Sequence, residues 1–225
     1  GANSTFVDMV MMVERIVQHF EWKEVNLLGH SMGGGVSMLY AGTFPEKVKK
    51  IVMIDLIKPM SYPIDMQPDR TRESIEQTFK IENRLNNSPP SYDYATMVEK
   101  MVKSYGHSVT EESAKAILKR GSQKNEDGTY SFHYDPRLKT RSLLSMTLDQ
   151  QKEFAKRIEC EMLIVKASLG PLYEDTKIYE EIMNIYEKKA KSFKYITVEG
   201  THHVHLNTPE AVAPDISNFL SGTDQ

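Results

Sequence analysis

The 225-residue chain has a single cysteine, Cys160, so it cannot form an internal disulfide bond. Chains without disulfides are typical of reducing compartments, and we expect a cytoplasmic location, with a peroxisomal one as the alternative. The sequence also lacks any apolar run near the roughly 20 residues of a membrane span, so we expect no such span. With no basic tract and a net charge of −3, the chain has no general attraction for nucleic acid, which we exclude as a partner.

The sequence does contain a serine flanked by glycines, between a short apolar run and a helical pattern. Val25–Leu28 has the length and β-branching of a buried strand, and apolar residues recur at helical spacing over Met32–Tyr40. The intervening Gly29-x-Ser31-x-Gly33 predicts a nucleophile elbow, because glycines allow a tight turn and close strand–helix packing. In an elbow the Met32 backbone N–H lies at the start of the helix, where it can bind an oxyanion. Close packing alone, or a weak phosphate cradle, is the simpler interpretation of the glycines, but no Gly-Lys-Ser/Thr follows them.

The rest of the pattern predicts an α/β domain built on a parallel sheet and interrupted by a helical insertion. An amphipathic helix over residues 4–20 precedes the elbow, and Ile51–Ile54 is a second buried strand. The sheet resumes at Met162–Val165 and Tyr195–Val198, followed by a last helix at about 208–220 that Pro214 is expected to kink or interrupt. We therefore expect a core of residues 1–58 and 158–225 around an insertion of residues 59–157.

Helical periods separated by prolines characterise this insertion. The expected helices run from Asp69 or Thr71 to Leu85, from about Asp93 to Tyr105, from Thr110 to Gly121, and from a Thr147–Gln150 capping box to about Ile158. Tyr130, Phe132 and Tyr134 alternate with polar residues, as in an extended arm. The arm is expected to form a seam between insertion and core, or else a wall facing a substrate.

Several of these segments resemble a known superfamily. His30–Gly34, Phe44–Glu46 and Ile51–Asp55 are similar to α/β-hydrolases, and residues 135–139 and 200–206 resemble the serine hydrolase-like (Kraken-type) group. The resemblance covers nearly the whole chain and implies a mostly parallel sheet with flanking helices, and a cap formed by the insertion. In that superfamily several strands precede the first helix. We therefore expect a longer protein whose N-terminal strands and second oxyanion donor lie upstream of Gly1.

The resemblance also implies a base for the serine. By their distances from Pro209, His202 takes the place of the catalytic histidine and His205 that of a supporting one, and His30 is a second supporting residue. A histidine cluster can instead bind a metal ion, but no cysteine or carboxylate partners occur nearby at ligand spacing. We therefore expect no metal site and no cofactor.

The carboxylate that orients the histidine is less well defined. Most members of the superfamily carry an aspartate in the turn after the strand before the last, where this chain has Glu174 and Asp175. Asp55, at the end of the strand after the elbow, occupies a place that some members use instead. We expect Asp175 to be the acid, with Glu174 and Asp55 as rivals.

The expected activity is that of a serine hydrolase with Ser31, His202 and a carboxylate, acting on an ester, amide or thioester of a small to medium apolar substrate. The same residues also serve carbon–carbon bond hydrolysis. A third possibility is a non-catalytic ligand-binding or interaction protein on the same scaffold. Epoxide hydrolysis and dehalogenation are disfavoured, since those members have an aspartate where this chain has Ser31.

Overall fold

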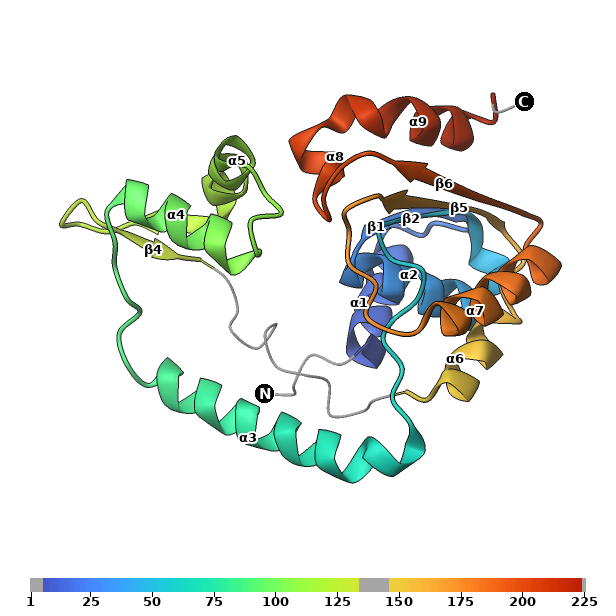
Figure 1. Cartoon of the computed structure of the whole chain (residues 1–225), viewed down its shortest axis with the longest axis horizontal. Coiled ribbons are helices and arrows are strands. Elements are labelled where there is room, and N and C mark those ends of the chain that lie inside the picture. The colour runs from blue at the N-terminus through green and yellow to red at the C-terminus, as the bar shows by residue number, and fades with distance from the viewer. Residues whose placement is uncertain (1–5, 134–145, 224–225) are drawn as a thin grey trace.

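The computed structural model describes residues 6–133 and 146–223, in which a four-stranded parallel sheet lies between helices (Figure 1). The strands have the order β1-β2-β5-β6. They are β1 (Val25–His30), β2 (Val48–Ile54), β5 (Glu161–Ala167) and β6 (Ser192–Val198). Because all four run in the same direction, the loops after their carboxyl ends meet at one edge of the sheet. The predicted α/β fold is confirmed.

Alternate residues of the central strands pack on opposite faces of the sheet, which explains why these strands are apolar throughout. In β2, Ile51 and Met53 belong to the large apolar cluster on one face, whereas Val52 and Ile54 belong to a second cluster on the other. Each such buried side chain contributes about 1.5–3 kcal/mol of hydrophobic stabilisation. The first face is covered by α1 (Phe6–His19), α2 (Met32–Thr43), α6 (Leu148–Ala155) and α7 (Thr176–Lys189), and the second by α8 (Val204–Asn207) and α9 (Ala213–Ser221).

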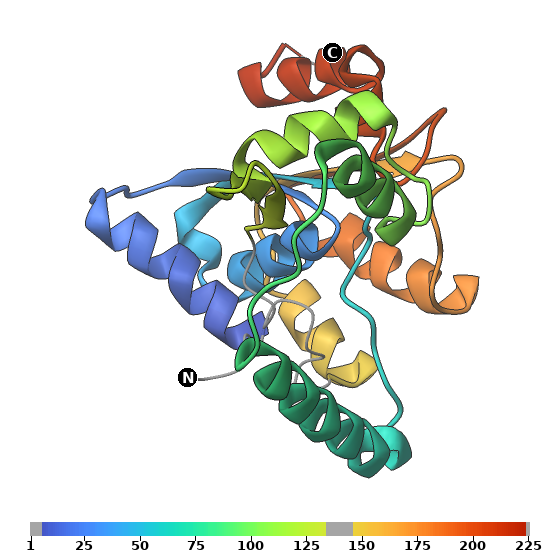
Figure 2. The same ribbon diagram turned by 90° about the vertical axis from the view of Figure 1, so that its left-hand side faces the viewer.

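The segment between β2 and α6 forms a cap beside the sheet. It contains α3 (Gln67–Leu85), α4 (Tyr94–Ser104), α5 (Glu111–Gly121) and a hairpin of β3 (Ser122–Lys124) and β4 (Tyr130–Phe132). The views of Figures 1 and 2 both show α3 apart from the sheet. Six buried residues give α4 and α5 a small core of their own: Met97, Val98, Met101, Val109, Ala114 and Leu118. Asp93 and Thr110 cap the two helices, as their sequences predict.

The helix α6, expected as the last helix of the insertion, packs with the core instead. Its predicted capping box of Thr147 and Gln150 is present. Ala155 is fully buried in the large core cluster, and α2 approaches α6 so closely that a Cβ on Gly42 would lie 2.6 Å from the Phe154 carbonyl oxygen. The cap therefore ends before α6 rather than at residue 157.

The expectation for the aromatic arm needs correction. Tyr130 and Phe132 pack against the core of α4 and α5, so this part of the arm stabilises the cap itself rather than forming a seam or a substrate wall. Tyr134 and the segment 135–139 lie outside the described residues. The last helix is interrupted, one of the two outcomes expected at Pro214: a short 3₁₀ turn at Pro209–Ala211 precedes α9, and Pro214 lies in the first turn of α9.

None of the helices in residues 6–133 and 146–223 combines the length and the apolar character needed to cross a membrane.

Candidate active site

Ser31 lies in a strained turn between β1 and α2. Its backbone has φ 53° and ψ −121°, a combination that residues other than glycine rarely adopt. The Ser31 carbonyl oxygen accepts hydrogen bonds from the N–H groups of Gly34 and Gly35 at 2.9 and 3.2 Å, which ties the serine to the first turn of α2. The turn has the strand–serine–helix geometry of a nucleophile elbow.

Gly29 makes this tight turn possible. A Cβ at position 29 would lie 2.2 Å from the carbonyl carbon and oxygen of Gly33, so any larger residue would force strand and helix apart. At Gly33 itself a Cβ would meet nothing within 4 Å. The expected need for glycine on both sides of the serine therefore holds at Gly29. At Gly33 there is room for a side chain, so space does not require glycine there.

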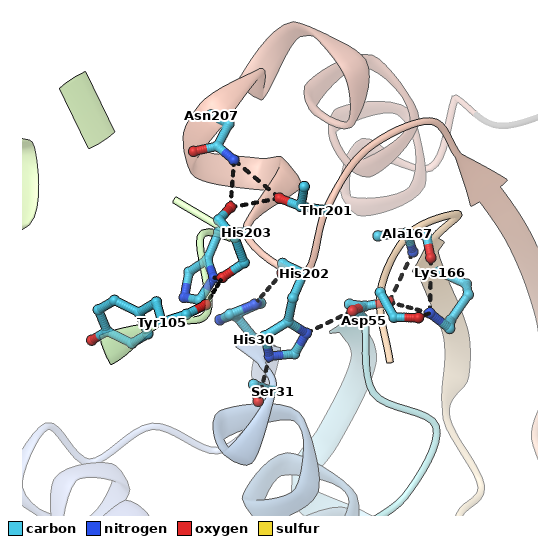
Figure 3. Close-up of polar contacts among 12 residues, drawn as sticks. His30, Ser31, Asp55, Tyr105, Lys166, Ala167, Thr201, His202, His203 and Asn207 are labelled. Atoms are coloured by element: carbon cyan, nitrogen blue, oxygen red, sulfur yellow. Dashed lines mark hydrogen bonds and ion pairs between the residues drawn. The ribbon is translucent and has the colours of Figure 1, made fainter. Parts of the chain in front are cut away.

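A continuous chain of hydrogen bonds joins Ser31, His202 and Asp55 (Figure 3). The His202 ring nitrogen Nε2 lies 2.9 Å from Ser31 Oγ, and Nδ1 lies 2.6 Å from Asp55 Oδ2. The three residues come from the ends of β1 and β2 and from the loop after β6, which meet at the carboxyl edge of the sheet. This arrangement is that of a nucleophile, a base and a carboxylate that orients the base.

The Asp55 side chain is fully buried and each carboxylate oxygen has a partner. Oδ2 faces His202, while Oδ1 accepts hydrogen bonds from the Ala167 N–H at 2.9 Å and from Lys166 Nζ at 2.7 Å. Burial alone would raise the pKa of Asp55, but the hydrogen bonds from His202, Lys166 and Ala167 outweigh it and hold the pKa below its usual value. Asp55 is therefore a carboxylate at neutral pH.

The preferred acid of the sequence analysis, Asp175, does not contact His202. Its carboxylate caps α7 and accepts a hydrogen bond from the Lys177 N–H at 2.9 Å. Glu174 points elsewhere too, because it pairs with the buried Lys58 and accepts hydrogen bonds from Ser61. The loop after β5 thus uses its carboxylates for structure, and Asp55 replaces Asp175 as the partner of His202.

The course of that loop explains the difference. Gly170 packs directly against the Asp55 side chain, so closely that a Cβ at position 170 would lie 2.0 Å from Asp55 Oδ2. Lys166 Nζ donates to the Gly170 carbonyl oxygen at 3.0 Å and fixes the turn there. Asp55 therefore lies between this turn and His202, and Glu174, farther along the loop, does not contact His202.

The supporting histidines lie close to His202. The His30 ring donates from Nε2 to the His202 carbonyl oxygen at 2.6 Å, and the His205 ring lies against the His30 ring, tilted by 34°, with centroids 4.1 Å apart. Burial lowers the pKa of His30 to about 4 and lowers that of His205 as well, so both are neutral at pH 7. These contacts hold the backbone of the loop that carries His202.

His203, to which the sequence analysis gave no role, links this loop to the cap. Its Nδ1 lies 2.7 Å from Ser108 Oγ, and its ring meets the Tyr105 ring edge to face at 4.8 Å (Figure 3). The Ser108 carbonyl oxygen accepts further hydrogen bonds from Thr201 Oγ1 at 2.6 Å and Asn207 Nδ2 at 2.7 Å. The turn between α4 and α5 is thus bonded to the residues on both sides of His202.

Two further features of the described residues concern metal binding and a groove. In the part of the chain that the structure describes, no three His, Cys, Asp or Glu side chains are arranged to hold a metal ion. A groove of about 420 Å³ lies on the cap and is lined by α4, α5 and His107, but by none of Ser31, His202 and Asp55.

Comparison with known proteins places the fold and the site in context. A sequence profile described as "alpha/beta hydrolase fold" matches residues 2–80. A probable serine hydrolase of Drosophila melanogaster is 33% identical over 216 residues, which cover 96% of this chain and 65% of that protein. A serine hydrolase-like protein of Danio rerio is 27% identical over 223 residues, which cover 98% of this chain and 68% of the relative. The chain thus spans about two thirds of the length of these relatives.

The similarity extends to three dimensions. The crystal structure of a hypothetical protein from Pseudomonas aeruginosa PAO1 superposes with a TM-score of 0.85 at 26% identity, over 98% of this chain and 76% of the other. Sequence, fold and the elbow-centred site agree: the chain belongs to the α/β-hydrolase superfamily and is similar to its serine hydrolase-like members.

Proposed function

We propose that this protein is a serine hydrolase that cleaves esters of small to medium apolar substrates through an acyl-enzyme. The observation that carries the proposal is the unbroken series of contacts from Ser31 Oγ to His202 Nε2 and from His202 Nδ1 to Asp55 Oδ2, at 2.9 and 2.6 Å. Both distances lie within the range in which proton transfer and orientation of a base are effective.

Asp55 determines which ring nitrogen of neutral His202 carries the proton. A buried carboxylate accepts a hydrogen bond, so the neutral imidazole carries its proton on Nδ1 and presents an unprotonated Nε2 to Ser31. In this tautomer Nε2 can accept the hydroxyl proton of Ser31.

The reaction then proceeds in two halves. Ser31 Oγ attacks the ester carbonyl carbon while its proton moves to His202 Nε2, and the tetrahedral intermediate collapses as that proton passes to the departing alkoxide. Water then attacks the acyl-enzyme with His202 again as the base, which releases the acid and restores Ser31. The Met32 backbone N–H, at the start of α2, is the proposed oxyanion donor.

The surroundings of the site support the proposal of a small, apolar substrate. Three exposed apolar side chains belong to residues that follow Ser31 or lie close in sequence to Gly170, which contacts Asp55: Met32, Leu169 and Leu172. The cap, bonded to the His202 loop through Ser108, supports an enclosed site for a small molecule. Thioesters and amides are open to the same residues, since each presents a carbonyl carbon that Ser31 Oγ can attack and a leaving group that His202 can protonate.

Hydrolysis of a series of p-nitrophenyl esters by the intact native protein tests the proposal. We expect release of p-nitrophenol from butyrate or octanoate to exceed that from acetate, and Ser31→Ala to lower kcat/KM by at least about 10³-fold. Circular dichroism must show that the variant is folded. Equal rates for the native protein and the folded variant would refute the proposal and favour a ligand-binding role for the scaffold.

A further inference from the structure

Lys166 approaches the triad from the side opposite to His202. It lies near the end of β5, and its Nζ donates hydrogen bonds to Asp55 Oδ1 at 2.7 Å and to the carbonyl oxygens of Ala167 and Gly170 at 2.8 and 3.0 Å (Figure 3). The side chain is only 9% exposed. Because an ammonium group has three hydrogens and each has an acceptor here, the group is held in one position.

A cation at this place has two effects on the triad. The first is geometric, since the hydrogen bond to Oδ1 prevents the Asp55 carboxylate from rotating away from His202. The second is electrostatic. Acyl transfer places a positive charge on His202, which Asp55 stabilises, but Lys166 offsets the charge of Asp55 and so weakens that stabilisation. An uncharged residue at position 166 would leave the carboxylate unopposed.

The other titratable groups around Asp55 and His202 carry no charge near neutral pH. They are His30 from β1, His203 and His205 from the segment after β6, Tyr173 from the loop after β5, and Tyr195 from β6. Burial lowers the pKa of His30 and of His203 to about 4 and also lowers that of His205, whereas burial raises the pKa of both tyrosines. Near neutral pH, Asp55 and the Lys166 ammonium group that donates to it are thus the charged groups beside His202.

We infer that Lys166 is a positioning residue of the triad, which holds Asp55 in place and, through its charge, keeps His202 unprotonated and able to act as a base at lower pH. The inference rests on the proposed function. The charge of Lys166 determines the direction of the expected shift in the pH profile. Without this charge the imidazolium form of His202 is favoured, so on acidification His202 becomes protonated, and stops acting as a base, at a higher pH.

The test is the rate at which a fluorophosphonate probe labels Ser31 in the intact protein between pH 5 and 9. This rate requires a neutral His202 but no knowledge of the natural substrate. In Lys166→Gln, which keeps a hydrogen-bond donor but not the charge, we expect the midpoint of the acid limb to move up by about one pH unit. In Lys166→Arg, which keeps the charge, the midpoint should return toward that of the native protein.

Lys58 provides a matched control. It is also a buried lysine paired with a carboxylate, Glu174, and bonded to several other acceptors, but its partners do not contact His202. In Lys58→Gln we expect a loss of thermal stability with an unchanged midpoint. If the midpoint of the acid limb shifted equally in Lys58→Gln and Lys166→Gln, the cause would be a general loss of stability rather than the charge beside Asp55. That result would overturn the inference.

The outcomes separate the inference from the proposed function. A native protein that is folded but never labelled at Ser31 contradicts the proposed function itself. Labelling of the native protein together with an unshifted midpoint in Lys166→Gln leaves the proposed function intact and overturns the role of Lys166. A measurement without variants guards against misfolding: ¹⁵N NMR of the native protein at pH 7 should show Lys166 as an ammonium group, and a neutral amine would contradict the inference.

Discussion

Replacing Asp55 by asparagine is expected to lower kcat/KM for ester hydrolysis by about 10³–10⁴-fold without unfolding the protein. The asparagine side chain is nearly the same size as that of aspartate, and its amide oxygen can still accept the hydrogen bonds of Lys166 and Ala167. The amide NH₂ group would then face His202 Nδ1, which must become an acceptor, so the ring proton moves to Nε2. With a proton on Nε2, His202 can no longer take one from Ser31.

Asp175→Asn is the matched control for this substitution. Asparagine is as good a helix N-cap as aspartate, so the start of α7 should be preserved and kcat/KM should stay within about twofold. Steady-state kinetics on both variants, with thermal denaturation to confirm folding, decides between the two carboxylates. A large loss in Asp175→Asn and none in Asp55→Asn would contradict the assignment of Asp55.

Gly170→Ala is expected to disable the site through a steric clash. The added Cβ would lie 2.0 and 2.4 Å from the two carboxylate oxygens of Asp55, so either the turn or the carboxylate must move. A displacement of about 1 Å at a catalytic group costs about 10²-fold in rate, and we expect a fall of that size in kcat/KM. The lost contact between Lys166 and the Gly170 carbonyl oxygen should also lower the melting temperature.

The corresponding control is Gly121→Ala, at the end of α5. A Cβ there would meet only Ile117, at an ordinary contact distance of 3.7 Å, and alanine is favourable in a helix. We expect unchanged kinetics and equal or slightly higher stability. If Gly170→Ala retained full activity, the close contact between this turn and Asp55 would have no functional importance.

The proposed nucleophile and the proposed base can be predicted because their signals are local in the sequence. Gly29 and Ser31 lie two residues apart, and the fold of the elbow depends on this stretch and the strand before it. His202 is predicted from its distance to Pro209, which lies in the same short segment after β6. The structure brings the two side chains to within 2.9 Å, as a working pair requires.

The proposed acid, Asp55, cannot be predicted in the same way, because its pairing with His202 depends on contacts between distant segments. When only the strand ends are counted, the sequence favours Asp175 and leaves Asp55 as a rival. What separates them is the turn at Gly170, which packs over Asp55, and the pairing of Glu174 with Lys58. A lysine at the end of the apolar run Met162–Val165 is the available signal, since a charge on a buried strand needs a partner of opposite charge.

The boundary of the cap differs from its prediction for a related reason. The capping box at Thr147 predicts where α6 begins but not what it packs against. Its burial against α2 depends on the lack of a side chain at Gly42, on a helix more than 100 residues earlier in the chain. Amphipathic periodicity predicts a helix, whereas its partner is determined by tertiary packing.

Peptide mapping after fluorophosphonate labelling is the most direct test of the central claim, that Ser31 is activated by His202 and Asp55. We expect a single adduct on the peptide that contains Ser31, lost in Ser31→Ala and formed much more slowly in Asp55→Asn. A folded native protein with no adduct on Ser31, or with an adduct that forms at the same rate in Asp55→Asn, would contradict the claim.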